Sequence, residues 1–386
     1  MSTRQRRDTA PADRATPVEI FFDVVFVLTI TQLAHLLEDH LDWSGLGSII
    51  LILGLLWYLY SGYAWLTNHV PPRRPAHKLL LFAAMAGFLL TAIAIPDAFT
   101  GSGLLFGIGY LVVVTVHLTL FSQSTARAGV RRLAPYNLGA ALLVLAAGLL
   151  SGPAVYALWA AAVFAQTVLP YLLPGHSWLG VAASFRIVPG HFVERHGLLV
   201  IVALGETVVT IGMGAPLDHL TPSTVGAIVL ALALPAALWW TYFTEAGAAE
   251  AALDRAELGP RSRLSARVYI LAHFVLLLGI IATATSLHAT VAHPDAPTGW
   301  PAALALSGGV ALFLVGIADV RRVVRHGRSG SRLVTAALVL ATIPVGAYVN
   351  ATLHLVVVIA PVTAMLILDG RRPAGPTRPV SRAART

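Results

Sequence analysis

Residues 46–66 read LGSIILILGLLWYLYSGYAWL, and a basic stretch, RRPAHK, follows at 73–78. The first stretch has no charged side chain and reaches the roughly 20 residues that a helix needs to cross the hydrocarbon core of a membrane. The second carries positive side chains, which resist transfer across a membrane. Apolar segments and basic loops alternate in this way along the whole chain, a pattern typical of a multi-pass membrane protein.

The composition also indicates a membrane protein. Of the 386 residues, 57% are hydrophobic and only 11% are charged, which is too little charged surface for a soluble protein of this length. Twelve segments are apolar enough to be spans. They are 19–37, 46–66, 79–95, 103–121, 137–150, 155–172, 196–213, 222–243, 268–288, 300–318, 333–349 and 352–367. Segments 137–150, 333–349 and 352–367 are short for a span and could be tilted or re-entrant.

The positions of the basic residues predict the orientation. If the chain crosses twelve times, all 26 Lys and Arg residues lie on one side. The turns on the other side carry no Lys or Arg, and their acidic residues are Glu38, Asp39, Asp42, Asp97, Asp218 and Asp295. Positive residues mark the cytoplasmic side, so both termini are predicted to be cytoplasmic. Because nearly all of the basic residues are Arg, a pattern typical of a GC-rich bacterial genome, the predicted location is a bacterial plasma membrane.

Two pairs of landmarks indicate an internal repeat. Val18-Glu19 opens the first span and Val193-Glu194 opens the seventh, while a W-x-x-Y pair occurs in the second span and again in the eighth. The predicted fold class is all-α: a polytopic membrane helix bundle of about 12 transmembrane helices, arranged as two parallel six-helix repeats. The predicted parts are a disordered basic tail (1–15), a first repeat (16–172), a linker (173–190), a second repeat (191–370) and a second disordered basic tail (371–386).

Ionisable side chains inside a bilayer cost about 2.5–3.5 kcal/mol each on insertion scales, so their positions are the main functional signal. Glu19 and Asp23 share one face of the first span near its cytoplasmic end. Gln32 and His35 lie nearer the outer end on roughly the opposite face, which predicts a central position for this helix. Glu19 could equally cap the helix, and Gln32 and His35 could be interhelical hydrogen-bond partners.

The seventh span repeats this pattern. His191, Glu194 and Arg195 stand at its cytoplasmic entrance, where helix capping or mutual pairing would also explain them. Glu206 lies deeper, within Leu-Gly-Glu-Thr, and a carboxylate at that depth needs a partner or a proton. His117, His273, Asn350 and His354 are its candidate partners.

Enzyme and cofactor motifs are scarce. The chain has no cysteine, which excludes thiolate metal sites and a cysteine nucleophile. His191 and His196 do not have the spacing that places two metal ligands on one helix face. We therefore expect no cofactor, no metal, no catalytic residue and no nucleic-acid partner, because basic loops already explain the pI of about 10.2. The expected partners are membrane lipids and a small ion or solute, with a homo-oligomer as a further expectation.

Three blocks of sequence resemble the bacterial low-temperature-requirement A family. They are Thr16–Leu33 with His35, the second span through Trp65-Leu-Thr-Asn68, and the block His191–Glu206. The resemblance covers nearly the whole hydrophobic region and implies an integral membrane protein associated with growth in the cold. The residues that match its motifs are Asp23, Gln32, His35, Asn68, Glu194, Arg195 and Glu206.

A second, weaker resemblance concerns the first span alone. Phe22-Asp23-Val-Val-Phe26 is similar to the opening helix of endolysosomal and bacterial potassium channels, which also use six-helix units. Phe22 stands where the motif of those channels has a serine, and the second half of this chain has Leu198 near the position of the motif aspartate.

Three functions remain open. The leading hypothesis is a channel or secondary transporter for a small ion or solute, with protons involved through Asp23, His35 and Glu206. The first alternative is an intramembrane lipid-modifying enzyme that uses the His191–His196 cluster and Glu206 at an interfacial site. The second is a structural or sensory membrane protein, which would be favoured if all embedded polar groups were paired with one another.

Overall fold

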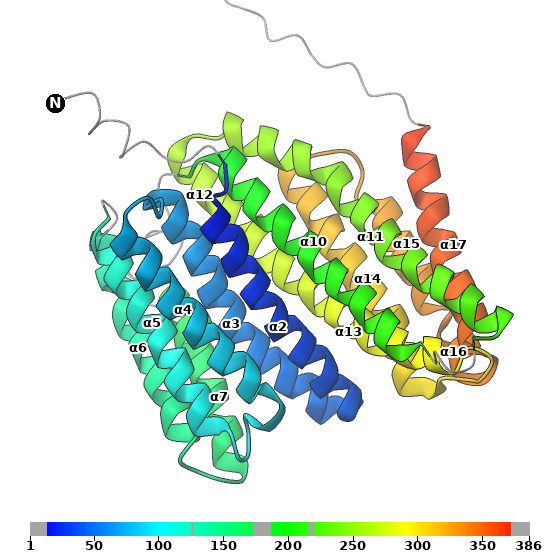
Figure 1. Cartoon of the computed structure of the whole chain (residues 1–386). Helices are drawn as coiled ribbons and strands as arrows, with labels where there is room; N and C mark the ends of the chain where they lie inside the picture. Colours follow the sequence, from blue (N-terminus) through cyan, green and yellow to red (C-terminus); the bar gives the residue numbers. More distant parts are fainter. Residues whose placement is uncertain (1–13, 125–126, 173–186, 216–219, 372–386) are drawn as a thin grey trace, which may run out of the picture.

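The computed structural model describes residues 14–124, 127–172, 187–215 and 220–371, and this part of the chain contains helices and turns but no β-strand (Figure 1). The predicted tails and the predicted linker lie largely outside these ranges. The helices of the first half are α2 (Pro17–Asp39), α3 (Trp43–His69), α4 (Pro75–Ala94), α5 (Gly103–Ser122), α6 (Arg127–Ala147), α7 (Pro153–Val163) and α8 (Leu169–Leu172). Those of the second half are α10 (Pro189–Gly214), α11 (Pro222–Arg255), α12 (Leu258–Ala266), α13 (His273–Ala292), α14 (Gly299–Val324), α15 (Gly330–Leu340), α16 (Ile343–Tyr348) and α17 (Ala351–Gly370).

Most of these helices are suited to a membrane. Within the described ranges, 10 helical segments are long and apolar enough to cross one, so the prediction of an all-α polytopic membrane bundle is confirmed. The segment Pro153–Val168 is apolar but shorter, and α6, which holds most of the predicted span 137–150, is not among the ten. The count of twelve crossings in two repeats therefore stays a prediction.

Two examples show where helix boundaries differ from the predicted spans. α11 continues to Arg255, well past the predicted end at 243, because the following Ala- and Glu-rich residues are strong helix formers. The predicted span 333–349 is divided into α15 and α16 by a turn at 341–342. Pro344 lies in the first turn of α16, where its missing N–H would have no helical partner.

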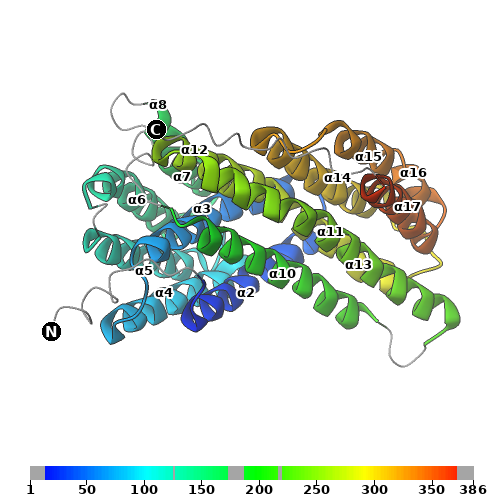
Figure 2. The same cartoon turned by 90° about the horizontal axis from the view of Figure 1, so that it is seen from above.

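The two halves of the chain lie beside each other, and α2, α3, α10 and α13 meet between them (Figures 1 and 2). α2 packs against α3 and α4 of its own half and against α10 and α13 of the other. The first helix is therefore central, as the polar residues on its two faces predicted.

Glycine permits close helix pairings in both halves. A Cβ on Gly87 of α4 would lie 2.9 Å from the Gly109 carbonyl oxygen of α5, and a Cβ on Gly279 of α13 would lie 2.6 Å from that of Gly309 on α14. Side chains at these positions would push the backbones apart, so small residues set both interhelical distances.

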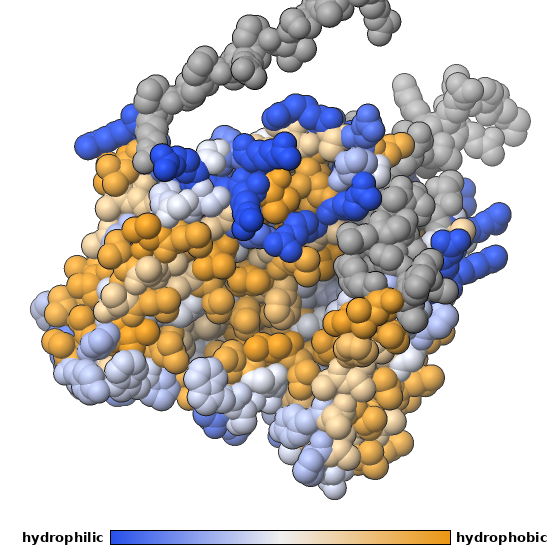
Figure 3. All heavy atoms as spheres, turned by 180° about the vertical axis from the view of Figure 1, so that it is seen from behind, coloured by the Kyte–Doolittle hydropathy of each residue, from blue (hydrophilic) through white to orange (hydrophobic). Residues whose placement is uncertain are grey.

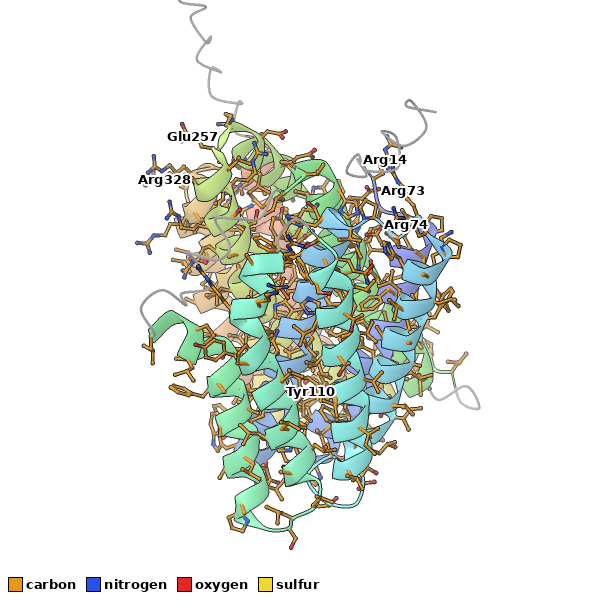
Figure 4. The ribbon with its side chains drawn as sticks, turned by 90° about the vertical axis from the view of Figure 1, so that its left-hand side faces the viewer. Arg14, Arg73, Arg74, Tyr110, Glu257 and Arg328 are labelled. Atoms are coloured by element: carbon orange, nitrogen blue, oxygen red, sulfur yellow. The ribbon has the colours of Figure 1, made fainter. Side chains whose placement is uncertain are left out.

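The surface separates into an apolar belt and two polar ends. Large exposed side chains such as Phe21, Val229 and Leu338 lie along the helices, and the apolar region lies between polar regions in Figure 3. Arg14, Arg73, Arg74 and Arg328 gather at one end of the bundle (Figure 4), which we call the basic end. The opposite end, called the far end, contains the turn between α2 and α3.

Helix starts at the far end have polar caps. The Asp42 carboxylate accepts hydrogen bonds from Ser44 Oγ and the Gly45 backbone N–H. These bonds, the one from Ser44 first, hold the pKa of the Asp42 carboxyl below its usual value. Asn350 caps α17 by accepting from the Leu353 N–H at 2.7 Å, so this side chain stabilises a helix start and does not face Glu206.

Candidate functional site

A buried ion cluster joins the two halves near the basic end. Arg195 of α10 donates to Glu19 Oε1 at 3.2 Å and to Asp23 Oδ1 at 2.5 Å, and both acids belong to α2. From α3, Thr67 Oγ1 accepts from Arg195 at 3.0 Å, and Tyr60 donates to Asp23 Oδ1 at 2.7 Å. We call these five residues the Arg195 cluster.

Local sequence explains how Glu19 reaches this position. Thr16 and Glu19 form a capping box at the start of α2, in which Glu19 Oε2 accepts from the Thr16 backbone N–H at 2.8 Å and its hydroxyl at 2.7 Å. The capping interpretation is therefore correct, but it describes one carboxylate oxygen only. The other oxygen accepts from Arg195, so Glu19 both caps α2 and takes part in the Arg195 cluster.

Hydrogen bonds determine which ring nitrogen of His191, at the start of α10, carries the proton. The Asn68 amide oxygen accepts from the Val188 N–H at 2.9 Å, and its nitrogen donates to the Val188 carbonyl at 3.2 Å. The same Asn68 nitrogen lies 3.1 Å from His191 Nδ1, which must therefore accept. The proton of the neutral ring is then on Nε2, which donates to Glu19 Oε1 at 3.0 Å.

With both carboxylates ionised, the Arg195 cluster carries a surplus negative charge. It holds two carboxylates, one guanidinium and an adjacent neutral imidazole, and Glu19, Asp23 and Arg195 are each no more than 1% exposed. Asp23 Oδ2 is buried and has no hydrogen-bond partner among the described residues. A buried, uncompensated charge is costly, so this cluster is suited to binding a proton or a cation.

The other predicted site residues lie elsewhere. His35 Nδ1 lies 3.6 Å from Glu38 Oε2 near the far end, where His288 of α13 lies 2.6 Å from Glu38. Gln32 is half-buried one turn earlier on α2. Asp23 and His35 are about 18 Å apart along the helix axis, so the structure does not bring them together.

The two remaining carboxylates are also separate. Glu194 is exposed and accepts from the Ala15 backbone N–H at 3.0 Å. Glu206 is half-buried on α10, and within the described ranges its side chain makes no hydrogen bond or ion pair. His273, a predicted partner of Glu206, instead lies 2.9 Å from the Tyr242 hydroxyl.

A second ion cluster was missed by sequence reasoning. Glu245 Oε1 accepts from Arg321 at 2.5 Å and from Arg332 at 3.1 Å, and Asp369 pairs with the same two arginines. We call these four residues the Glu245 cluster. All four lie outside the predicted spans, and only the extension of α11 to Arg255 would have indicated that Glu245 lies within a helix.

Two small cavities lie near these clusters. The first, of about 40 Å³, is lined by aromatic residues with His117 and Asn137. The second, of about 10 Å³, is lined by Glu245, Tyr242, Tyr269 and His273. About 10–15 Å³ is enough for one water molecule, so both cavities are suited to water or to a very small solute.

Comparison with known proteins supports the family resemblance seen in the sequence. Residues 14–368 match the family model described as bacterial low temperature requirement A protein. The chain is also 28% identical over 328 residues to an uncharacterized protein of Rhizobium meliloti (strain 1021), covering 82% of this chain and 80% of that one. No solved structure matches, and the weaker resemblance to potassium channels finds no support. Because the family model spans nearly the whole chain, this protein belongs to the bacterial low temperature requirement A family.

Proposed function

We propose that this protein is a secondary transporter or channel for a small ion or solute, in which Asp23 binds a proton. The observation that carries the proposal is the surplus negative charge of the Arg195 cluster, buried where α2 of one half meets α10 of the other. Ionisable groups at such an interface are typical of substrate or proton sites in transporters.

The proposed architecture is twelve spans in two parallel six-helix repeats, 16–172 and 191–370, joined by the linker 173–190. In the first half α2 packs on α3 and α4, α4 on α5, α5 on α6, α6 on α7, and α3 on α5 and α7. In the second half α10 packs on α11 and α13, α13 on α14, α14 on α15, α15 on α17, and α11 on α14 and α17. The same sequence of pairings, together with the matching close glycine contacts of α4 with α5 and of α13 with α14, supports the repeat.

The basic end is proposed to face the cytoplasm of a bacterium. Its arginines would meet anionic lipid headgroups, which stabilise a basic membrane surface. In this orientation the Arg195 cluster lies on the cytoplasmic side of the bundle, and the trio of His35, Glu38 and His288 lies on the outer side. A proton crossing the protein would therefore meet titratable groups near both surfaces.

A structural or sensory role is the second candidate. It is favoured by the Glu245 cluster, in which two acids and two arginines balance within one half, and by the small size of both cavities. The lipid-modifying alternative has less support, because His191 and His196 are both 0% exposed and a headgroup would have to reach them through packed helices.

Proton flux tests the proposal. Purified protein is placed in liposomes that contain a pH-sensitive dye, and a potassium gradient with valinomycin sets the membrane potential. We expect dye-reported proton movement that falls at least about tenfold in Asp23→Asn, because the amide cannot bind and release a proton. Asp319→Asn removes a carboxylate from the partly exposed pair with Arg267 and serves as the matched control. Wild-type flux no greater than that of empty liposomes, or equal rates in Asp23→Asn, would reject the proposal.

A further inference from the structure

A buried cluster of aromatic and imidazole rings lies beside the Arg195 cluster and joins the two halves. It consists of Trp57, Phe192, His196, Tyr242, Tyr269 and His273, which we call the ring cluster. Trp57 stacks on Tyr60 of the Arg195 cluster on one side and on His273 on the other, with centroid distances of 5.4 and 6.4 Å. The rings therefore run from the charge surplus at Asp23 to the second cavity, which His273 and Tyr269 line.

The two histidines of the ring cluster have the same tautomer. His196 Nδ1 lies 2.8 Å from the Phe192 carbonyl, and His273 Nδ1 lies 2.8 Å from the Val268 carbonyl. A carbonyl oxygen only accepts, so each Nδ1 carries the proton and each Nε2 presents a lone pair when the ring is neutral.

The Nε2 lone pairs of His273 and His196 differ in their hydrogen-bond donors. His273 Nε2 accepts from the Tyr242 hydroxyl at 2.9 Å. His196 is 0% exposed, so water cannot reach its Nε2 from the surface, and no described residue donates to this atom. A buried acceptor without a donor costs about 1–3 kcal/mol, so one of two otherwise matched imidazoles lacks a hydrogen-bond donor.

The backbone around His273 is also irregular. Arg267–Ala272 forms a π-helical turn, and the hydrogen bond from His273 to Val268 reaches back five residues. Turns of this kind are costly and often occur at functional sites. This one turns the His273 ring towards His196, at a centroid distance of 5.4 Å.

The surroundings of His196 restrict what could donate to it. The rings of Phe192, Tyr269 and Trp57 lie 4.6, 4.6 and 6.1 Å from the imidazole. Aromatic faces are negative and attract cations, so an anion is disfavoured. His196 lines neither of the two cavities and is 0% exposed, so the ligand must be small.

We propose that His196 Nε2 is the acceptor for a small protonated amine, of which ammonium is the smallest, held among the faces of the ring cluster. This inference rests on the proposed transport function and names its substrate class. Ammonium supplies the N–H donor that His196 lacks, a positive charge for the aromatic faces, and a volume close to that of water. Alkali cations have no N–H and leave the lone pair without a hydrogen bond.

Binding is measured on the full chain in detergent by the ¹⁵N NMR signals of labelled histidine during titration with ammonium, potassium or sodium chloride. We expect ammonium alone to shift the Nε2 signal of His196, and His196→Gln to weaken binding about tenfold through loss of a charge-assisted hydrogen bond. For this variant, which lacks the reporting ring, the His273 signal and calorimetry give the affinity. His354→Gln is the matched control, because His354 is a buried imidazole outside the ring cluster and lines neither cavity.

If His196→Gln does not fold, Trp57→Phe replaces it, since phenylalanine keeps a ring but attracts cations less than tryptophan; we expect about threefold weaker binding. Equal responses to ammonium and sodium, no response to ammonium, or unchanged affinity in the variant that folds would overturn the inference. Proton flux in liposomes without ammonium binding would overturn this inference and leave the proposed function intact. Ammonium binding without any flux would leave the binding inference intact and reject the proposed transport function.

Discussion

The Arg195 cluster and the Glu245 cluster are both largely buried, but they differ in charge and in place. The first holds two acids and one arginine, and it joins α2 and α3 to α10, across the two halves. The second holds two acids and two arginines, all of them in α11, α14, α15 and α17 of the second half. A balanced cluster inside one half suits a permanent contact, whereas an unbalanced one between halves suits a site whose charge and contacts change.

Both clusters leave one carboxylate oxygen without a partner in the described part of the chain, on Asp23 and on Glu245. A free oxygen alone therefore does not distinguish them. The distinction is the number of arginines, because two guanidiniums neutralise the Glu245 cluster and one does not neutralise the Arg195 cluster. The comparison is tested by removing charges one at a time.

Arg195→Gln is expected to have the largest effect. It leaves Glu19 and Asp23 buried without a cation, and removal of one partner of a buried ion pair costs about 3–5 kcal/mol. Thermal unfolding of the purified protein in detergent, followed by circular dichroism, measures the loss. A change below about 1 kcal/mol would mean that water compensates the charges of the cluster, so that their number does not affect the free energy of unfolding.

The carboxylates of the two clusters are expected to respond in different ways. Glu245→Gln leaves two arginines against Asp369 and should lower the free energy of unfolding by roughly 2–3 kcal/mol. Asp23→Asn removes the surplus charge and should change it by less than about 1 kcal/mol, or stabilise the protein. The same unfolding measurement compares both variants. Equal losses would show that the two clusters are alike and would remove the basis of the comparison.

An exposed ion pair gives the smallest expected effect. Arg267 lies 2.8 Å from Asp319, and its side chain is 51% exposed. Exposed pairs contribute about 0–1 kcal/mol, so Arg267→Gln should change the unfolding free energy by less than about 1 kcal/mol. A larger loss would indicate that this pair also supports the adjacent π-helical turn, and the variant would then be unsuitable as a reference for the buried clusters.

The sequence alone led to several members of the candidate site. Glu19, Asp23, His191 and Arg195 were identified because each is an ionisable residue at the entrance of an apolar helix. Their pairing was not predicted, since Glu19 and Arg195 are 176 residues apart and nothing in either segment specifies its neighbour. His273 was assigned to Glu206, but the π-helical turn directs its ring to Tyr242 and His196.

The same limit explains the residues that sequence reasoning missed. Arg321, Arg332 and Asp369 stand within a few residues of helix ends, where charged side chains are ordinarily solvated. They are buried only because four helices of the second half converge there. Glu38 was assigned to a turn for a similar reason, and its contact with His288 depends on the packing of α2 against α13.

The sequence by itself determined that this chain is an all-helical membrane protein of its family, because hydropathy, length and motif are properties of each segment separately. Only the tertiary structure decided which charges neutralise one another, which imidazole lacks a donor and which cluster lies between the halves. Those properties depend on interhelical contacts, and contacts are set by side-chain shape and close backbone approach across segments far apart in the chain.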